Sequence, residues 1–181
     1  SIVMTCGAAG GLNIVFKSIL EEGDEVIVFA PFFGEYSNYI KNFNGKEVIA
    51  STEENTFLPD IERLKRSVTE RTKAVIINSP NNPTGVIYSS KVIEDICFVL
   101  KQKQLEYNND IYLIADEPYR ELVYDDTDVP YIFNYYDNSF VCYSYSKSLS
   151  LPGERIGYVA INNKMNDFEE MTAALSIANR I

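Results

Sequence analysis

Apolar residues along the chain alternate between short continuous runs and longer runs with helical spacing. Short runs predict strands that are buried on both faces, whereas apolar residues at every third or fourth position predict amphipathic helices. The predicted strands cover residues 25–29, 46–50, 73–78, 111–115, 140–143 and 156–161. The predicted helices cover residues 12–20, 36–43, 61–68, 92–100 and 165 onward. Asp60 and Ser89 precede two of these helices and are candidate N-caps.

Strands that are apolar on both faces and separated by helices are typical of a mostly parallel sheet covered on two sides. We therefore predict an α/β fold with three layers, α/β/α, in a single domain. Ligands of such sheets bind where the strands end. Asn82, Asp116 and Lys147 each follow an apolar run, so we expect these polar side chains at one edge of the sheet.

The acidic composition argues against some classes of partner. The chain has 16 Lys and Arg against 26 Asp and Glu, which gives a net charge of -10. Nucleic acids and anionic membrane surfaces would repel such a chain, so we expect neither as a partner. Apolar runs such as 74–77 and 111–115 are far too short to cross a bilayer.

The lack of histidine limits the available chemistry. It removes His-based catalytic triads, the common zinc sites and the usual general base, so we expect no metal centre. Catalysis would have to use Lys, Tyr, Asp, Glu or a cofactor.

Cys6, Cys97 and Cys142 form no CxxC pair, and each lies in an apolar context. An odd number of cysteines in this setting predicts reduced core residues in a cytoplasmic protein. No basic region followed by an apolar stretch opens the chain, so no export signal is predicted. The chain starts without methionine, inside what looks like another strand, and stops within a helical pattern, which we interpret as an excerpt of a longer protein.

The segment SYSKSLSLPGERIG, residues 144–157, follows the predicted strand 140–143. Its serines and glycines are poor helix formers, so we predict a loop that holds Lys147 and Arg155 in fixed positions. A lysine fixed at a strand end near a second cation can have a depressed pKa and form a Schiff base with an aldehyde. A solvated lysine is the more frequent alternative for any single lysine.

The segment TCGAAGGLN, residues 5–13, places small residues directly before the first predicted helix. Unpaired backbone N–H groups and the helix dipole at such a turn favour a phosphate group. Ser144 and Ser146 would add hydroxyl donors, and Arg155 would add a guanidinium group. A tight turn without a ligand explains this segment equally well on its own.

Asp116 ends a predicted apolar strand, and a carboxylate buried there needs a cation such as a protonated pyridine nitrogen. Asn82 and Tyr119 are candidate hydrogen-bond partners of a phenolic oxygen, and Phe33 is a candidate cover for an aromatic ring. Taken singly, each residue has a more ordinary explanation. Asp116 would be a cap, Asn82 part of a turn, Tyr119 a residue at the edge of the core, and Phe33 a core residue. Together with the lysine and the anion site, they are a full set of partners for pyridoxal phosphate.

Three motifs together resemble the class I/II family of pyridoxal-phosphate-dependent aminotransferases, the aspartate aminotransferase group of fold type I. The motifs are SYSKSLSLPGERIG, NNPTG at 81–85 and DEPY at 116–119. The resemblance covers essentially the whole chain. It implies that residues 1–181 are the cofactor-binding large domain of a longer aminotransferase, whose N-terminal segment and C-terminal small domain are absent.

The resemblance also implies a role for each matching residue near the cofactor ring. Lys147 is similar to the Schiff-base lysine and Asp116 to the partner of the pyridinium nitrogen. Asn82 and Tyr119 match the residues bonded to the phenolic oxygen. Phe33 matches the stacking aromatic, where some relatives have tryptophan or tyrosine. The implied catalytic residues are Lys147, Asp116 and Tyr119.

The phosphate, by the same resemblance, would rest on the backbone amides of Ala8 and Ala9. The side chains of Ser144, Ser146 and Arg155 would complete its site. The implied reaction transfers an amino group between an amino acid and a 2-oxo acid in a cytoplasmic homodimer.

In the family, an arginine near the C-terminus binds the substrate carboxylate, and a tyrosine of the partner subunit contacts the phosphate. Both regions lie outside this sequence, so we expect the chain alone to bind cofactor weakly and to transaminate poorly or not at all. Two alternatives stay open: a carbon–sulfur lyase that uses the same residues for β-elimination, and a non-catalytic sensor that binds pyridoxal phosphate.

Overall fold

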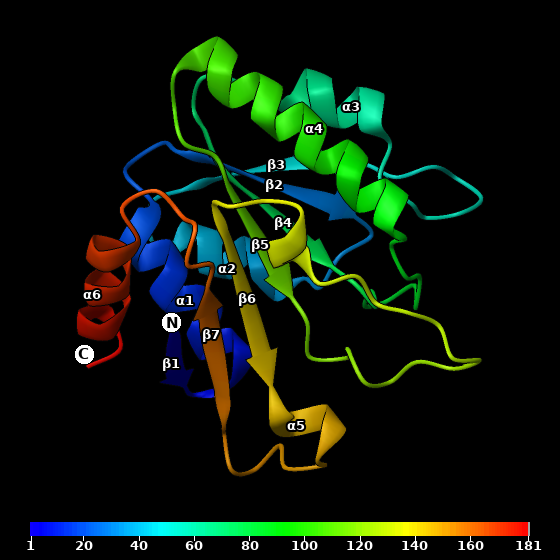
Figure 1. Ribbon diagram of the computed structural model, residues 1–181, viewed down its shortest axis with the longest axis vertical. Helices are drawn as coiled ribbons and strands as arrows, with labels where there is room; N and C mark the ends of the chain where they lie inside the picture. Colours follow the sequence, from blue (N-terminus) through cyan, green and yellow to red (C-terminus); the bar gives the residue numbers. More distant parts are fainter. Residues whose placement is uncertain (181) are drawn as a thin grey trace.

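The predicted strands pair into one sheet in the computed structural model, which describes residues 1–180 (Figure 1). The seven strands lie in the order β1-β7-β6-β5-β4-β2-β3. Their bounds are β1 Ile2–Thr5, β7 Gly157–Ile161, β6 Ser139–Ser144, β5 Tyr112–Asp116, β4 Thr72–Asn78, β2 Glu25–Ala30 and β3 Lys46–Ser51. Neighbouring strands from β6 to β3 are parallel, whereas β7 is antiparallel to both β6 and β1. The predicted α/β fold with a mostly parallel sheet is confirmed.

The antiparallel direction of β7 does not follow from the apolar pattern. Only residues 145–156 connect β6 to β7, and they contain the short helix α5 (Tyr145–Ser148). A parallel neighbour needs a crossover that packs on a face of the sheet, whereas an antiparallel neighbour needs only a turn. Because α5 lies at the end of β6 rather than on a face of the sheet, the chain returns in the opposite direction (Figure 1).

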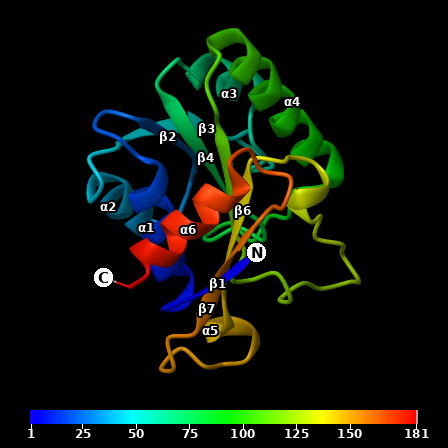
Figure 2. The ribbon, with the colours of Figure 1, turned by 60° about the vertical axis from the view of Figure 1, so that its left-hand side comes forward.

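Helices cover both faces of the sheet (Figure 2). One face carries α1 (Gly7–Ile19), α2 (Glu35–Lys41) and α6 (Phe168–Ala178), and the other carries α3 (Ile61–Ser67) and α4 (Ser90–Tyr107). Successive side chains of a strand point to opposite faces, so Val26 and Val28 of β2 pack in the first cluster and Ile27 and Phe29 in the second. This double burial explains the continuous apolar runs, and the three predicted layers are confirmed.

Both predicted N-caps are in place. The Asp60 side chain accepts a hydrogen bond from the Arg63 N–H at 3.0 Å at the start of α3. The Ser89 hydroxyl accepts one from the Val92 N–H at 3.4 Å at the start of α4. Each cap satisfies a backbone donor that the helix itself leaves unpaired. A 3-10 helix, η1 (Ile132–Asn134), precedes β6.

The predicted loop at residues 144–157 is wrong in its first part. Lys147 lies in α5, because the Ser144 hydroxyl accepts a hydrogen bond from the Ser146 N–H at 3.2 Å and caps this helix. The final helix is also shorter than its pattern predicts, since α6 ends at Ala178. Residue 181 lies outside the described part of the chain.

The predicted burial of the cysteines holds for two of the three. Cys97 and Cys142 are buried free thiols, as expected for core residues. Cys6 is exposed, which contradicts the prediction, because it lies between the edge strand β1 and the first residue of α1. In residues 1–180, every helix is too short or too polar for a membrane span.

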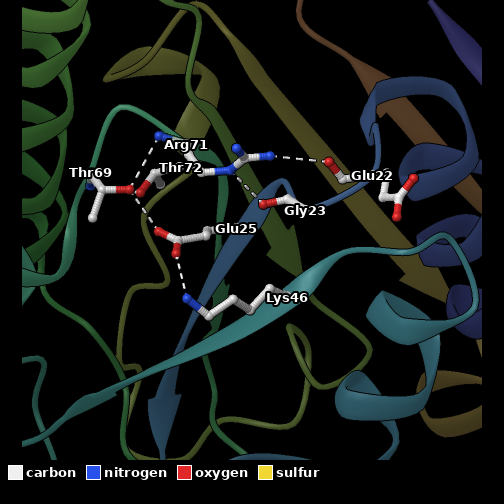
Figure 3. Close-up of polar contacts among 7 residues, drawn as sticks. All are labelled: Glu22, Gly23, Glu25, Lys46, Thr69, Arg71 and Thr72. Atoms are coloured by element: carbon white, nitrogen blue, oxygen red, sulfur yellow. Dashed lines mark hydrogen bonds and ion pairs between the residues drawn. The ribbon is translucent and has the colours of Figure 1, made fainter.

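A polar network holds the edge of the sheet where β2, β3 and β4 begin (Figure 3). Glu25 is 6% exposed, and its two carboxylate oxygens accept hydrogen bonds from Lys46 Nζ at 2.8 Å and from the Thr69 hydroxyl at 2.7 Å. Arg71 donates to two backbone carbonyls in the turn before β2 at 3.0 and 3.1 Å. Burial raises the pKa of Glu25, but hydrogen bonds from Lys46 and Thr69 and the charges of Lys46 and Arg71 bring it below its ordinary value.

Replacing Glu25 with alanine is expected to lower the free energy of unfolding by about 2 kcal/mol. The change removes the acceptor of the Thr69 hydroxyl and the ion pair that links β2 to β3. Because the pKa of Glu25 is lowered on folding, its contribution is present above the ordinary carboxyl pKa and is lost as the pH falls through the lowered value. Urea denaturation at about pH 7 and at about pH 3 measures both effects.

The matched control for this experiment is Lys91→Ala, which removes the exposed ion pair between Lys91 and Asp95 on α4. Exposed pairs contribute little, so this variant should unfold like the wild type. Equal losses of stability in the two variants would show that the Glu25 network has no special part in holding the sheet.

Candidate functional site

A cavity of about 350 Å³ lies at the edge of the sheet where β4, β5 and β6 end. Every residue that the sequence predicts for the site lines this cavity: Ala8, Ala9, Phe33, Asn82, Asp116, Tyr119, Ser144, Ser146, Lys147 and Arg155. The other lining residues are Leu12, Tyr39, Asn78, Pro118 and Pro152. The parallel strands therefore bring distant segments to one place, as expected for this class of sheet.

Asp116 is the last residue of β5 and is 6% exposed. Its backbone carbonyl accepts a hydrogen bond from the Asn78 side-chain amide at 2.7 Å, which ties the ends of β5 and β4 together. Its Oδ2 accepts a hydrogen bond from the Tyr36 hydroxyl, whereas its Oδ1 is buried and has no hydrogen-bond partner within residues 1–180. Burial raises the pKa of Asp116 to about 6, although the hydrogen bond from Tyr36 lowers it. A buried acceptor without a hydrogen bond is costly, so this oxygen indicates that a ligand supplies the donor.

Lys147 reaches the cavity from α5. Its Nζ lies 5.8 Å from the centroid of the Tyr119 ring, and it belongs to none of the ion pairs formed by the described residues. The helix that carries it is capped by Ser144, whose hydroxyl also donates to Ser146 Oγ at 2.8 Å. The amine is therefore presented at the end of β6 without an acidic partner.

The start of α1 and the Arg155 side chain form an anion-binding corner. Gly7 has a φ of 70°, and a Cβ at this position would lie 3.3 Å from Arg155 Nη2 and 3.7 Å from Ser144 Oγ. Arg155 Nη1 donates to the Pro152 carbonyl at 2.8 Å, which fixes the guanidinium group. The first turn of α1 contains no acidic residue. Its unpaired N–H groups, its dipole and the guanidinium charge all favour an anion.

Gly157 lets β7 pass directly against the start of α1. A Cβ at this position would overlap the Tyr143 carbonyl oxygen and would lie 2.7 Å from the Gly7 carbonyl carbon. Only glycine fits such a close approach of three backbone segments. The contact fixes the segment that carries Arg155 against the N-terminus of α1.

The other predicted residues lie around the same cavity. The Asn82 N–H donates to Asn78 Oδ1 at 2.6 Å, which anchors the turn after β4. The Phe33 ring is 37% exposed and meets the Tyr36 ring edge-on, with 5.7 Å between centroids. Burial and the charge of Asp116 raise the pKa of Tyr119, so its hydroxyl stays protonated and can donate near neutral pH.

Six residues at or beside the cavity are absent from the sequence prediction of the site: Leu12, Tyr36, Tyr39, Asn78, Pro118 and Pro152. For Asn78 a signal existed, since it is the polar residue that ends the apolar run 73–78 and pairs in register with Asp116. Tyr36 follows Phe33 by one helical turn, but this spacing also describes an ordinary core aromatic. Its contact with Asp116 depends on how α2 packs on the sheet.

The family model described as aminotransferase class I and II matches residues 1–180. The chain belongs to this aminotransferase family. An aspartate aminotransferase of Pyrococcus horikoshii is 35% identical over 174 residues, which cover 95% of this chain and 42% of the relative. An aspartate aminotransferase of Bacillus subtilis is 38% identical over 164 residues, which cover 88% of this chain and 40% of the relative. The resemblance inferred from the three motifs is confirmed.

Solved aminotransferase structures have the same fold as this chain. An amino transferase of Eubacterium rectale matches with a TM-score of 0.97 and 44% identity, over 99% of this chain and 45% of that one. The aspartate aminotransferase of Thermus thermophilus with maleate matches with a TM-score of 0.85 and 32% identity, over 99% of this chain and 44% of that one. This aminotransferase chain thus spans less than half the length of these relatives. Because the matching relatives are named aminotransferases, the lyase alternative is not favoured.

The side chains at the cavity of this aminotransferase chain fit one kind of ligand. The positive groups of Lys147 and Arg155 lie together in a chain whose net charge is -10. Asp116 Oδ1 has no hydrogen-bond partner among the described residues. Together with the anion corner and the exposed face of Phe33, it suits a small aromatic molecule with an anionic group at one end and a ring N–H. The free amine of Lys147 suits a carbonyl group on the same molecule.

Proposed function

We propose that this chain is the cofactor-binding large domain, residues 1–181, of a longer aminotransferase that depends on pyridoxal phosphate. One observation carries the proposal: Asp116, whose buried Oδ1 has no hydrogen-bond partner within residues 1–180, lines the same cavity as Lys147 and Arg155. Asp116 would bind the ring nitrogen of that cofactor, Lys147 would bond to its aldehyde, and Arg155 would bind its phosphate. Membership of the family supports the same assignment.

The remaining lining residues would hold the cofactor in a fixed orientation. Phe33 would cover one face of its ring, and Asn82 and Tyr119 would donate hydrogen bonds to its phenolic oxygen. The phosphate would be bound by the backbone amides of Ala8 and Ala9 and by Ser144, Ser146 and Arg155. A site built from so many segments of a rigid sheet would restrict the cofactor to one orientation.

When bound, pyridoxal phosphate supplies an aldehyde that bonds to amines and a ring that withdraws electrons from the carbon next to that nitrogen. The Lys147 amine would be the site of covalent attachment and, once displaced by a substrate amine, the base that takes a proton from the substrate α-carbon. The Asp116 carboxylate would hold a proton on the ring nitrogen. Tyr119 would keep the phenolic oxygen hydrogen-bonded.

The substrates would be an amino acid and a 2-oxo acid, with aspartate the first donor to test because the relatives include aspartate aminotransferases. We also propose a cytoplasmic homodimer. The exposed apolar side chains of Leu149, Leu151 and Ile156 beside the cavity support an interface there, and the free cysteines support a reducing compartment. We expect full activity only from the complete polypeptide.

The test is an assay of the complete protein with pyridoxal phosphate, aspartate and a panel of 2-oxo acids. We expect aspartate to be converted to its 2-oxo acid only when an acceptor is present, as followed with a coupled dehydrogenase. Release of ammonia and pyruvate from cysteine conjugates without an acceptor would instead identify a lyase. Cofactor binding without turnover of any amino acid in a broad panel would favour the sensor.

A further inference from the structure

The Asp116 carboxylate has two oxygens in different environments. Oδ2 accepts a hydrogen bond of 2.5 Å from the Tyr36 hydroxyl, a residue 80 positions earlier in the chain. Oδ1 is equally buried but has no hydrogen-bond partner in the described part of the chain. A carboxylate rotates easily about its terminal torsion, so a donor on one oxygen decides which oxygen remains for a ligand.

Tyr36 is itself held rigidly. It is 1% exposed and belongs to the core cluster under α1 and α2. The Phe32 ring stacks on it with 6.3 Å between centroids, and the Phe33 ring meets it edge-on at 5.7 Å. The Tyr36 hydroxyl is therefore held in one position, from which it can orient the Asp116 carboxylate. One of the two rings packed on Tyr36, that of Phe33, also lines the cavity.

We propose that Tyr36 is a positioning residue, which binds Asp116 Oδ2 and so leaves Oδ1 facing the cavity to bind the ring nitrogen of the cofactor. The inference rests on the proposed function, because it needs a ligand with a ring N–H. Tyr36 does not line the cavity and would act only through Asp116. Its hydrogen bond also favours the ionised carboxylate, which accepts at both oxygens, over the protonated acid.

Other titratable groups face Asp116 from the elements packed around it. They are Tyr39 of α2, Cys142 of β6, Glu117 and Tyr119 of its own segment, and the cations Lys147 and Arg155 across the cavity. Burial raises the pKa of Cys142, and its pairing in register with Asp116 places it on the neighbouring strand. A Tyr36→Phe change leaves all these groups in place, so its effect on Asp116 can be separated from theirs.

The experiment measures pyridoxal phosphate binding to the complete protein after removal of cofactor. Four variants are compared with the wild type: Tyr36→Phe, Asp116→Asn, the double variant and the control Tyr136→Phe. Tyr136 is 2% exposed and donates a buried hydrogen bond of 2.9 Å to the Ile111 carbonyl, away from the cavity, so it reports the cost of losing any buried phenol hydroxyl. A second measurement follows the pKa of Asp116 in the cofactor-free protein by carboxyl carbon NMR.

We expect Tyr36→Phe to weaken binding about tenfold in the wild-type background and by less than about twofold in Asp116→Asn. It should also raise the pKa of Asp116, whereas Tyr136→Phe should change neither quantity. Loss of affinity of equal size in both backgrounds, or no difference from Tyr136→Phe, would overturn the positioning role alone. A wild-type protein that binds no pyridoxal phosphate would overturn the proposed function and the positioning role together.

Discussion

Replacing Lys147 with alanine will abolish covalent attachment of pyridoxal phosphate and lower amino-acid turnover by at least about 10⁴-fold. Among residues 1–180, Lys147 supplies the only amine of a side chain that lines the cavity, so no second amine there can replace it as base. Small-residue substitution on the short helix α5 should leave the fold intact, because Lys147 takes part in no ion pair formed by residues 1–180.

The measurement is borohydride reduction of the loaded protein followed by intact mass and peptide mapping. The wild type should gain the mass of one reduced cofactor at Lys147, and the variant should gain none. Lys164→Ala is the matched control, since Lys164 is exposed and lies outside the cavity. Retention of the reduced cofactor on another lysine, with turnover preserved, would refute the assignment of Lys147.

Replacing Asp116 with asparagine is expected to have opposite effects on binding and on stability. Binding of pyridoxal phosphate should weaken by about 100-fold, because a neutral amide cannot form a charge-assisted hydrogen bond with a protonated ring nitrogen. The cofactor-free protein, in contrast, should gain about 2 kcal/mol of unfolding free energy at about pH 8, because the variant no longer buries a charge without a cation.

The gain in stability has a defined pH dependence. Burial raises the pKa of Asp116 from 3.8 to about 6, so between these values the unfolded chain is ionised while the folded chain keeps its proton. The wild type therefore loses stability as the pH rises through this window, and the penalty is constant above it. Urea denaturation of the cofactor-free proteins should show the Asp116→Asn advantage growing from about pH 4 to about pH 6. An advantage that is independent of pH, or a less stable variant, would contradict this account of Asp116.

The strands and caps could be predicted from the sequence because their signals are local. The run 73–78 is apolar at successive positions, so its own residues predict a strand that is buried on both faces. Asp60 caps a helix that starts at the next residue. The residues at the cavity were predicted because motifs specify them. Their gathering at one edge follows from the parallel strands that precede them.

The features that escaped prediction depend on contacts between distant segments. The hydrogen bond from Tyr36 to Asp116 spans 80 positions and requires α2 to pack on the sheet in one orientation. Cys6 looks like a core residue by its neighbours, but β1 is an edge strand and leaves it exposed. Helix α5 forms among poor helix formers because Ser144 caps it at the end of β6.

The lining of the cavity runs from Ala8 to Arg155, so no local stretch of chain contains it. Unfolded molecules would therefore have negligible affinity for the ligand, and saturation would pull the folding equilibrium toward the native form by mass action. At a ligand concentration 100 times the dissociation constant, the gain is about 2.7 kcal/mol. The supply of pyridoxal phosphate would then govern how much of the polypeptide survives proteolysis in a cell, as well as how much of it carries the cofactor.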